Sequence, residues 1–191
     1  MSVASPGRPA PSEFSPHAKG YVDLVPDDDL IVTLERQPRE TVLMLKPVDE
    51  ASAGTVTYEP GKWSIKQIVG HVSDAERIFA TRILRIARAD RTPLPGFEQD
   101  DYVASAGSNQ RTLADLLAEY ESVRNATLTL LRSLTPDAWL RVGSANNHDQ
   151  SVRGVAYTLA GHELHHVKIL RERYLPLLNR AGEVGLALTG Q

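Results

Sequence analysis

Hydrophobic residues recur with the 3.6-residue period of an α-helix in four stretches of the chain. In each stretch leucine, isoleucine and valine return every three or four positions, which is typical of an amphipathic helix with one buried face. The predicted helices cover residues 28–46, 64–89, 112–134 and 151–174. Because four such helices can bury their apolar faces against one another, the pattern predicts an all-α fold, a four-helix bundle.

The start of the second helix is the best-marked boundary in the sequence. Ser64 and Gln67 have the S-x-x-Q spacing of a capping box, in which each side chain accepts a backbone hydrogen bond from the other residue. Trp63 and Ile68 flank this box as a hydrophobic staple. Inside the first helix, Pro38 removes one amide donor, so we expect a kink there.

The segments outside the helices are of three kinds. Residues 1–26 hold five prolines and few large apolar groups, a composition that buries too little surface to offset the entropy of ordering, so we predict a flexible proline-rich arm. We predict that residues 27–176 form the bundle domain and that residues 177–191 are a frayed C-terminal tail. Residues 91–110 are a long connection without helical period, and because long loops in compact domains are commonly functional, we expect this one to wall a pocket.

Composition and charge narrow the functional classes. The 191 residues include 21 basic and 24 acidic side chains, a net charge of -3, which argues against nucleic acid as a partner. The absence of cysteine excludes disulfides, thiolate metal sites and a cysteine nucleophile. No secretory signal or membrane-spanning stretch is recognisable, so we expect a cytoplasmic protein with no membrane partner.

Three of the six histidines occupy core-facing positions of the predicted helices. His71 lies in the apolar stripe of the second helix, and His162 and His166 are four residues apart on one face of the fourth. An i, i+4 pair of imidazoles can bind one cation, and a third from a neighbouring helix completes a three-nitrogen site with room for water or substrate. The alternative is that these are core histidines with ordinary hydrogen bonds. His17 and His148, in the arm and in a polar loop, are expected to be solvated.

Residues 162–166 also match H-E-x-x-H, the signature of one class of zinc metalloproteases. That class needs a third ligand further along the chain, and no histidine follows His166. It also packs its active-site helix beside a sheet, for which the sequence shows no pattern. We therefore set the protease interpretation aside.

The polar residues near the histidines each have more than one interpretation. Asp74 lies one turn after His71 and either orients a ligand imidazole or is a surface or capping carboxylate. Glu163 lies about 100° around the helix from His162. It is either a base beside the metal or a solvent-facing side chain, and we favour the solvent-facing position. His165 is off the axis of the histidine pair. It has three alternative roles: to border the pocket, to form a hydrogen bond with a loop, or to bind a ligand. These three are only weak catalytic candidates.

Four arginines follow one another along the second helix and are most simply a solvated face. They are Arg77, Arg82, Arg85 and Arg88. If one of them pointed into the mouth of a pocket, it would suit an anionic substrate.

Three motifs of the chain resemble those of the DinB/YfiT-like family, in the same order and within a likeness that covers residues 20–176. They are YEPGKWSIKQIVGHVSDAER at 58–77, RTPLPGF at 91–97 and AGHELHH at 160–166. The resemblance implies an up-down-down-up four-helix bundle, often a homodimer, that holds a divalent metal on three histidines. Residue by residue, these ligands correspond to His71, His162 and His166. The metal implied is zinc or nickel, with iron as an alternative, and Pro38 is a departure from the family pattern.

The resemblance leaves the reaction on a small-molecule substrate open. In a hydrolase the metal lowers the pKa of a bound water towards ~7. In a thiol S-transferase the metal binds the thiolate of a low-molecular-weight thiol and directs it to an electrophile, and since the chain has no cysteine, that thiol must be a cofactor. We favour the S-transferase because no clear general base accompanies the ligands. A non-catalytic metal-binding bundle is the third alternative, and cofactor-binding residues stay unassigned.

Overall fold

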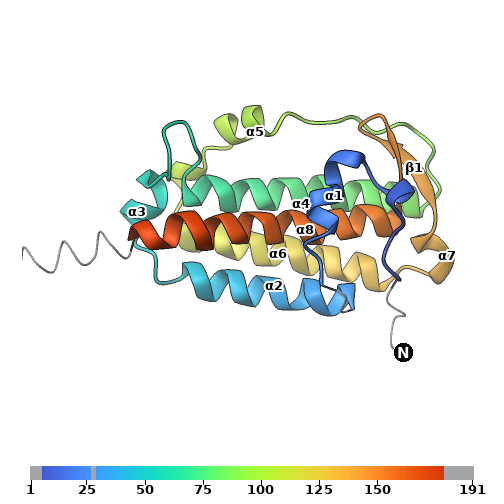
Figure 1. Ribbon diagram of the computed structural model, residues 1–191, viewed down its shortest axis with the longest axis horizontal. Helices are drawn as coiled ribbons and strands as arrows, with labels where there is room; N and C mark the ends of the chain where they lie inside the picture. The colour runs from blue at the N-terminus through green and yellow to red at the C-terminus, as the bar shows by residue number, and fades with distance from the viewer. Residues whose placement is uncertain (1–5, 27–28, 179–191) are drawn as a thin grey trace, which may run out of the picture.

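Four long helices lie alongside one another in the computed structural model, which describes residues 6–26 and 29–178 (Figure 1). They are α2 (Leu30–Leu45), α4 (Ile65–Ala87), α6 (Leu113–Arg132) and α8 (Val152–Ile169). The last continues into a π-helical turn, η4 (Leu170–Tyr174). Each helix begins within two residues of its predicted start, and the predicted all-α four-helix bundle is confirmed. Of the predicted C-terminal tail, residues 179–191 lie outside the described residues.

The four helices begin at caps that the sequence supplies. Ser64 Oγ accepts a hydrogen bond from the Gln67 amide at 3.2 Å, and the Gln67 side chain accepts one from the Ser64 amide at 2.9 Å. The other three helices are capped by Asp29, Thr112 and Ser151. Such caps satisfy amides that have no partner within the first turn. Pro38 lies inside α2, which continues past it to Leu45, so the missing amide donor does not end the helix.

The order of the helices follows the up-down-down-up topology. In Figure 1 the colour gradient shows that α4 and α6 run in one direction and that α2 and α8 run in the other. Parallel neighbours in a bundle need a connection that returns along its whole length. Residues 88–112 make this connection, and they include α5 (Gln99–Ser105) and a 3-10 turn, η3 (Ser108–Gln110).

Short elements cover the ends of the bundle. They are α3 (Glu50–Thr55), α7 (Pro136–Trp139) and an antiparallel hairpin of β1 (Val142–Ala145) and β2 (His148–Ser151). Asn146 and Asn147 form its turn with φ of 52° and 62°, the left-handed backbone that a two-residue type I′ turn requires. From the sequence, this region is expected to be a polar loop. His148, expected to be solvated, is half-buried, with its ring 6.1 Å from that of the exposed His17.

The described N-terminal residues, 6–26, pack against α8, in contrast to the flexible arm that their composition predicts. They form η1 (Pro11–Glu13), η2 (Pro16–Ala18) and α1 (Lys19–Val22). Their few apolar side chains are nevertheless buried: Phe14, Ala18, Val22 and Val25. Two glycines of α8 make room for this backbone, since a Cβ on Gly154 would lie 2.0 Å from Glu13 O and one on Gly161 would lie 1.9 Å from Tyr21 O. Composition alone does not reveal a groove of this kind.

Two apolar clusters fill the bundle, one towards each end, and polar side chains lie between them. Along α2, α6 and α8 several buried polar residues fall in sequence between members of the two clusters. They are Gln37 and Thr41 of α2, Arg124 and Thr127 of α6, and His162, Glu163 and His166 of α8. The chemistry-bearing side chains are therefore held in the middle of the bundle. In the part of the chain that the structure describes, no helix is long and apolar enough to cross a membrane.

Candidate metal centre

Three buried histidines from two helices converge in the middle of the bundle. His71 comes from α4, and His162 and His166 come from successive turns of α8. One nitrogen of each imidazole lies within 4.8 Å of the others, and Nε2 of His71 is 3.1 Å from Nε2 of His162. None of the three residues is more than 7% exposed. The structure thus brings together the three residues that helical spacing singles out.

The three imidazoles are neutral at pH 7. Burial lowers the pKa of His71 to about 4, against a smaller opposing effect of the Asp100 charge. Burial and the neighbouring imidazoles lower the pKa of His166 to about 3 and hold that of His162 well below its ordinary value. Each ring therefore carries one nitrogen with a free lone pair, and the neutral imidazole is the form that binds metals.

The hydrogen-bonding state of these rings fits a bound cation. Nδ1 of His71 and Nδ1 of His166 are buried and have no hydrogen-bond partner among the described residues. Burying imidazole nitrogens without partners costs free energy, and a divalent cation that accepts a lone pair from each ring reduces that cost. Three nitrogen donors suit zinc, nickel, copper and iron.

Aromatic side chains enclose the three histidines. The ring of Trp63 lies 4.7 Å from that of His71 and 6.2 Å from that of His166. The ring of Tyr21, from the N-terminal segment, meets that of His162 edge-on at 5.4 Å. These rings limit the access of water, so electrostatic interactions at the centre are stronger than they would be in solvent.

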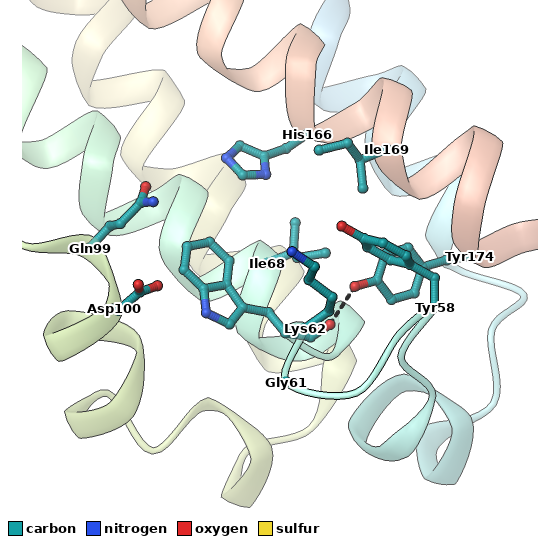
Figure 2. A pocket seen from close by; sticks show the side chains of 10 residues that line it. Tyr58, Gly61, Lys62, Ile68, Gln99, Asp100, His166, Ile169 and Tyr174 are labelled. Carbon is teal, nitrogen blue, oxygen red and sulfur yellow. Dashed lines mark hydrogen bonds between the residues drawn. The ribbon is translucent and has the colours of Figure 1, made fainter.

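Two cavities, each of about 320 Å³, together reach two of the three histidines. The Tyr58 cavity reaches His166, and its other lining residues include Tyr58, Lys62, Trp63, Asp100 and Tyr174. Figure 2 shows Gln99 and Asp100 on one side of this cavity and Tyr58 and Tyr174 on the other. The Arg82 cavity reaches His162, and its other lining residues include Ser15, Tyr21, Phe79, Arg82 and Phe97. Gln99 lines both cavities, so the 91–110 connection walls a pocket, as predicted.

A buried polar network crosses all four helices next to the histidines. Its centre is Arg124 of α6, which is fully buried and bonds both carboxylate oxygens of Glu76 of α4 at 2.8 Å. It also donates to Glu163 of α8 at 2.7 Å, and to Gln37 Oε1 at 2.8 Å and Leu34 O at 3.0 Å, both of α2. Burial opposes the charge of Arg124, but the charges of Glu163 and Glu76 outweigh it and raise the pKa of Arg124. The guanidinium thus stays charged, with a partner for every N–H.

The solvent-facing position that we favour for Glu163 from the sequence is wrong, because this residue is 1% exposed. Besides Arg124, its carboxylate accepts hydrogen bonds from Thr41 Oγ1 at 2.9 Å and from the Tyr120 hydroxyl. Helical angle alone does not show that α2 and α6 cover this side of α8. With three donors on its carboxylate, Glu163 is an anchor of the network.

The remaining candidates lie at the edges of the centre. Asp74 accepts a hydrogen bond from Arg77 at 3.2 Å, which agrees with the surface interpretation. His165 is half-buried, and its ring lies 5.3 Å from those of Tyr21 and His166. It is outside the group of three nitrogens.

The arginines of α4 differ from one another. Arg77 and Arg85 form ion pairs, with Asp74 and Glu119 and with Asp90, and Arg88 is exposed. For Arg82 the predicted solvated position is wrong, because this side chain is buried under the 91–110 connection and donates to Pro95 O at 2.9 Å.

Arg124 is not among the site residues predicted from the sequence. The signal was present, because Leu117, Tyr120, Arg124 and Leu128 step by three or four residues along one face of α6. A charged residue within such a stripe indicates a buried partner of opposite charge.

The sequence profile of the DinB superfamily matches residues 33–170, and no curated protein sequence matches the chain. The structure is similar to that of YfiT from Bacillus subtilis, reported as a probable metal-dependent hydrolase with an unusual four-helix bundle topology. The TM-score is 0.65 at 16% identity, over 83% of this chain and 93% of YfiT.

A second similar structure is that of a mycothiol-dependent maleylpyruvate isomerase, with a TM-score of 0.60 at 16% identity. The likeness covers 76% of this chain and 61% of the isomerase. A histidine-to-alanine mutant of the same isomerase matches with the same TM-score at 17% identity. At these identities the likeness shows the shared fold.

Proposed function

The chain belongs to the DinB superfamily, and we propose on this basis that it is a metal-dependent enzyme with thiol S-transferase-like chemistry on a small molecule. His71, His162 and His166 would hold the divalent metal, zinc or nickel in the first place and iron as an alternative. When bound, the metal supplies a Lewis acid that lowers the pKa of a thiol or of a water molecule. The neutral state of the three rings and the unpartnered Nδ1 atoms of His71 and His166 support this assignment.

The two cavities are the observation that favours an S-transferase. A transfer between a thiol and an electrophile needs room for two molecules at one centre, and here two cavities reach different histidines of the same group. The chain has no cysteine, so the thiol is a low-molecular-weight cofactor. Trp63 and Tyr21 cover the histidines from the two sides and restrict competing water.

A metal-dependent hydrolase is the second candidate, and Asp100 favours it. This carboxylate lines the Tyr58 cavity and is close enough to His71 for its charge to raise the pKa of that imidazole. A carboxylate in this position can accept a proton from a water molecule that attacks a substrate. The similar fold of YfiT agrees with this alternative.

Metal content tests the centre first. We would purify the untagged full-length protein without nickel columns or chelators and measure metals by elemental analysis, beside His166→Ala and a control, His148→Ala. About one divalent metal ion per chain is expected in the native protein and in the control, with loss in His166→Ala. No metal in any of the three proteins would overturn the proposal, and the histidines would then be core residues only.

Activity assays on the metal-loaded protein separate the reactions. Thiol-dependent consumption of 1-chloro-2,4-dinitrobenzene supports the S-transferase. Hydrolysis of p-nitrophenyl acetate that needs no thiol and is lost in Asp100→Asn supports the hydrolase. Neither activity, with metal bound, would contradict both and indicate a non-catalytic metal-binding bundle.

We also propose that the protein is cytoplasmic and acts on a small molecule and, as the family resemblance implies, that it is a homodimer. Sedimentation velocity is expected to give twice the mass of one chain. A mass of one chain at micromolar concentration would contradict the dimer without affecting the metal centre.

A further inference from the structure

Arg82 is a buried arginine without an acidic partner among the residues that the structure describes. It is 7% exposed, and its guanidinium donates one hydrogen bond, to Pro95 O at 2.9 Å, and lies over the ring of Phe79 at 5.8 Å. No carboxylate of the described residues forms an ion pair with it, in contrast to Arg77 and Arg85 on the same helix. A guanidinium has five N–H donors, so most N–H groups of Arg82 have no acceptor among the described residues.

Arg82 lines a cavity of suitable size and composition for a small ligand. The volume of about 320 Å³ is at the lower end of the range for small-molecule sites. Phe79 and Phe97 supply apolar walls, and Ser15 contributes a buried hydroxyl that has no hydrogen-bond partner among the described residues. The same cavity reaches His162, one of the three centre histidines.

We propose that the Arg82 cavity binds the carboxylate of a small organic acid, with Arg82 and Ser15 as hydrogen-bond donors and Phe79 and Phe97 against its apolar part. The planar guanidinium matches a carboxylate in two parallel hydrogen bonds, and burial strengthens them. That the acid is the electrophilic substrate rests on the proposed function, whereas its binding rests on the cavity alone. Glu98, the acidic residue on the cavity wall, is exposed, and water screens its charge.

A carboxylate fits this wall better than inorganic phosphate does. Phe79 and Phe97 line the same cavity as Arg82, and their rings favour an anion that carries an apolar group. Benzoate is therefore a suitable probe. Benzamide has the same shape without the charge, and inorganic phosphate has charge without the apolar group.

The test is calorimetric titration of the full-length protein with each probe, in the chelator-treated and in the zinc-loaded form. The variant is Arg82→Gln, which keeps a donor for Pro95 O but removes the charge, and the matched control is Arg88→Gln, an exposed arginine of the same segment. We expect benzoate to bind both forms of the native protein and of the control. The affinity of Arg82→Gln for benzoate should be lower than that of the native protein by a factor of about ten or more. Benzamide should bind the native protein more weakly than benzoate does, by a similar factor.

Four results would overturn the proposal. They are equal benzoate affinity in native protein and Arg82→Gln, equal affinity for benzoate and benzamide, tighter binding of phosphate than of benzoate, and benzoate binding that requires zinc. If Arg82→Gln does not fold, Phe97→Ala tests the same cavity from the connection, with loss of benzoate affinity expected and unchanged affinity contradicting the proposal. Arg82-dependent binding to the chelator-treated protein would persist even if the protein held no metal, so the two proposals fail separately.

Discussion

Arg124 and Glu163 form an ion pair in the centre of the bundle, with 2.7 Å between Nη2 and Oε2 and neither side chain more than 2% exposed. Glu163 lies on α8 between two of the three centre histidines, His162 and His166. The pair therefore connects α6 to the helical turn that carries both imidazoles. Since Arg124 also bonds Glu76 of α4, one side chain joins both histidine-bearing helices.

Replacing Arg124 should strongly destabilise the protein. In Arg124→Met the carboxylates of Glu76 and Glu163 lose their buried counter-charge, so we expect the free energy of unfolding to fall by about 3–5 kcal/mol. The matched control is Thr41→Val, which removes one hydrogen bond to Glu163 and should cost about 1 kcal/mol. Urea denaturation at pH 7 measures both. A loss below about 1 kcal/mol for Arg124→Met would show that the network contributes little to stability.

Removing the metal should lower the thermal stability. If the ion binds only the folded chain at about 1,000 times its dissociation constant, it contributes about 4 kcal/mol, which corresponds to a Tm shift of roughly 10 °C. Differential scanning calorimetry before and after chelation measures this shift. His166→Leu should not respond to chelation, and its metal-free Tm should equal or exceed that of metal-free native protein, because it removes a buried Nδ1 without a partner. Equal Tm values with and without bound metal would contradict a structural effect of the ion.

The packing of the N-terminal segment should depend on acidic pH. Glu13 accepts hydrogen bonds from Arg153 at 2.8 and 2.6 Å, which, despite partial burial, lower the pKa of the carboxyl to about 2. Because the folded pKa lies below the ordinary value of 4.5, this stabilisation is complete above pH 4.5 and is lost as the pH falls towards 2. Amide hydrogen exchange of residues 6–26 should therefore accelerate, relative to that of α4, over this range.

Glu13→Gln removes the charge and serves as the control for this effect. It should cost about 1–2 kcal/mol at pH 7 and flatten the acid dependence of the segment. If native protein and Glu13→Gln respond alike between pH 5 and pH 2, a different group controls the acid response.

A methyl group on Gly161 should displace α1. The added Cβ would lie 1.9 Å from Tyr21 O, a backbone atom, so Gly161→Ala forces the N-terminal segment away from α8 and moves Tyr21 off His162. We expect a loss of about 2 kcal/mol or more in chemical denaturation, as for other overpacked sites. Gly20→Ala is the control, because its Cβ would meet no atom within 4 Å. Equal stability of the two variants would show that the segment does not depend on this contact.

The helices and the histidine group could be predicted because their signals are local. The capping box of Ser64 and Gln67 and the 3.6-residue period need only neighbours within one turn. The i, i+4 spacing of His162 and His166 likewise places both on one face without knowledge of the partner helix. His71 was found by the same rule, applied to the apolar stripe of α4.

The surroundings of the centre could not be predicted in this way. Gly161 contacts Tyr21, and Arg82 contacts Pro95, across segments whose approach no periodicity encodes. The angle of Glu163 on α8 favours a solvent-facing position, but α2 and α6 cover this side chain with Thr41, Tyr120 and Arg124.

The all-α class, the starts of the four helices and the core-facing positions of the three histidines can be predicted from the sequence, because helix formation and facing depend on interactions within about four residues. The surroundings of Arg124, Glu163 and Arg82, the burial of residues 6–26 and the two cavities arise only when the chain is folded. Each of these depends on the side chain or groove that a distant segment presents. Burial and hydrogen-bond partners are properties of the packed assembly, and they assign these residues their roles.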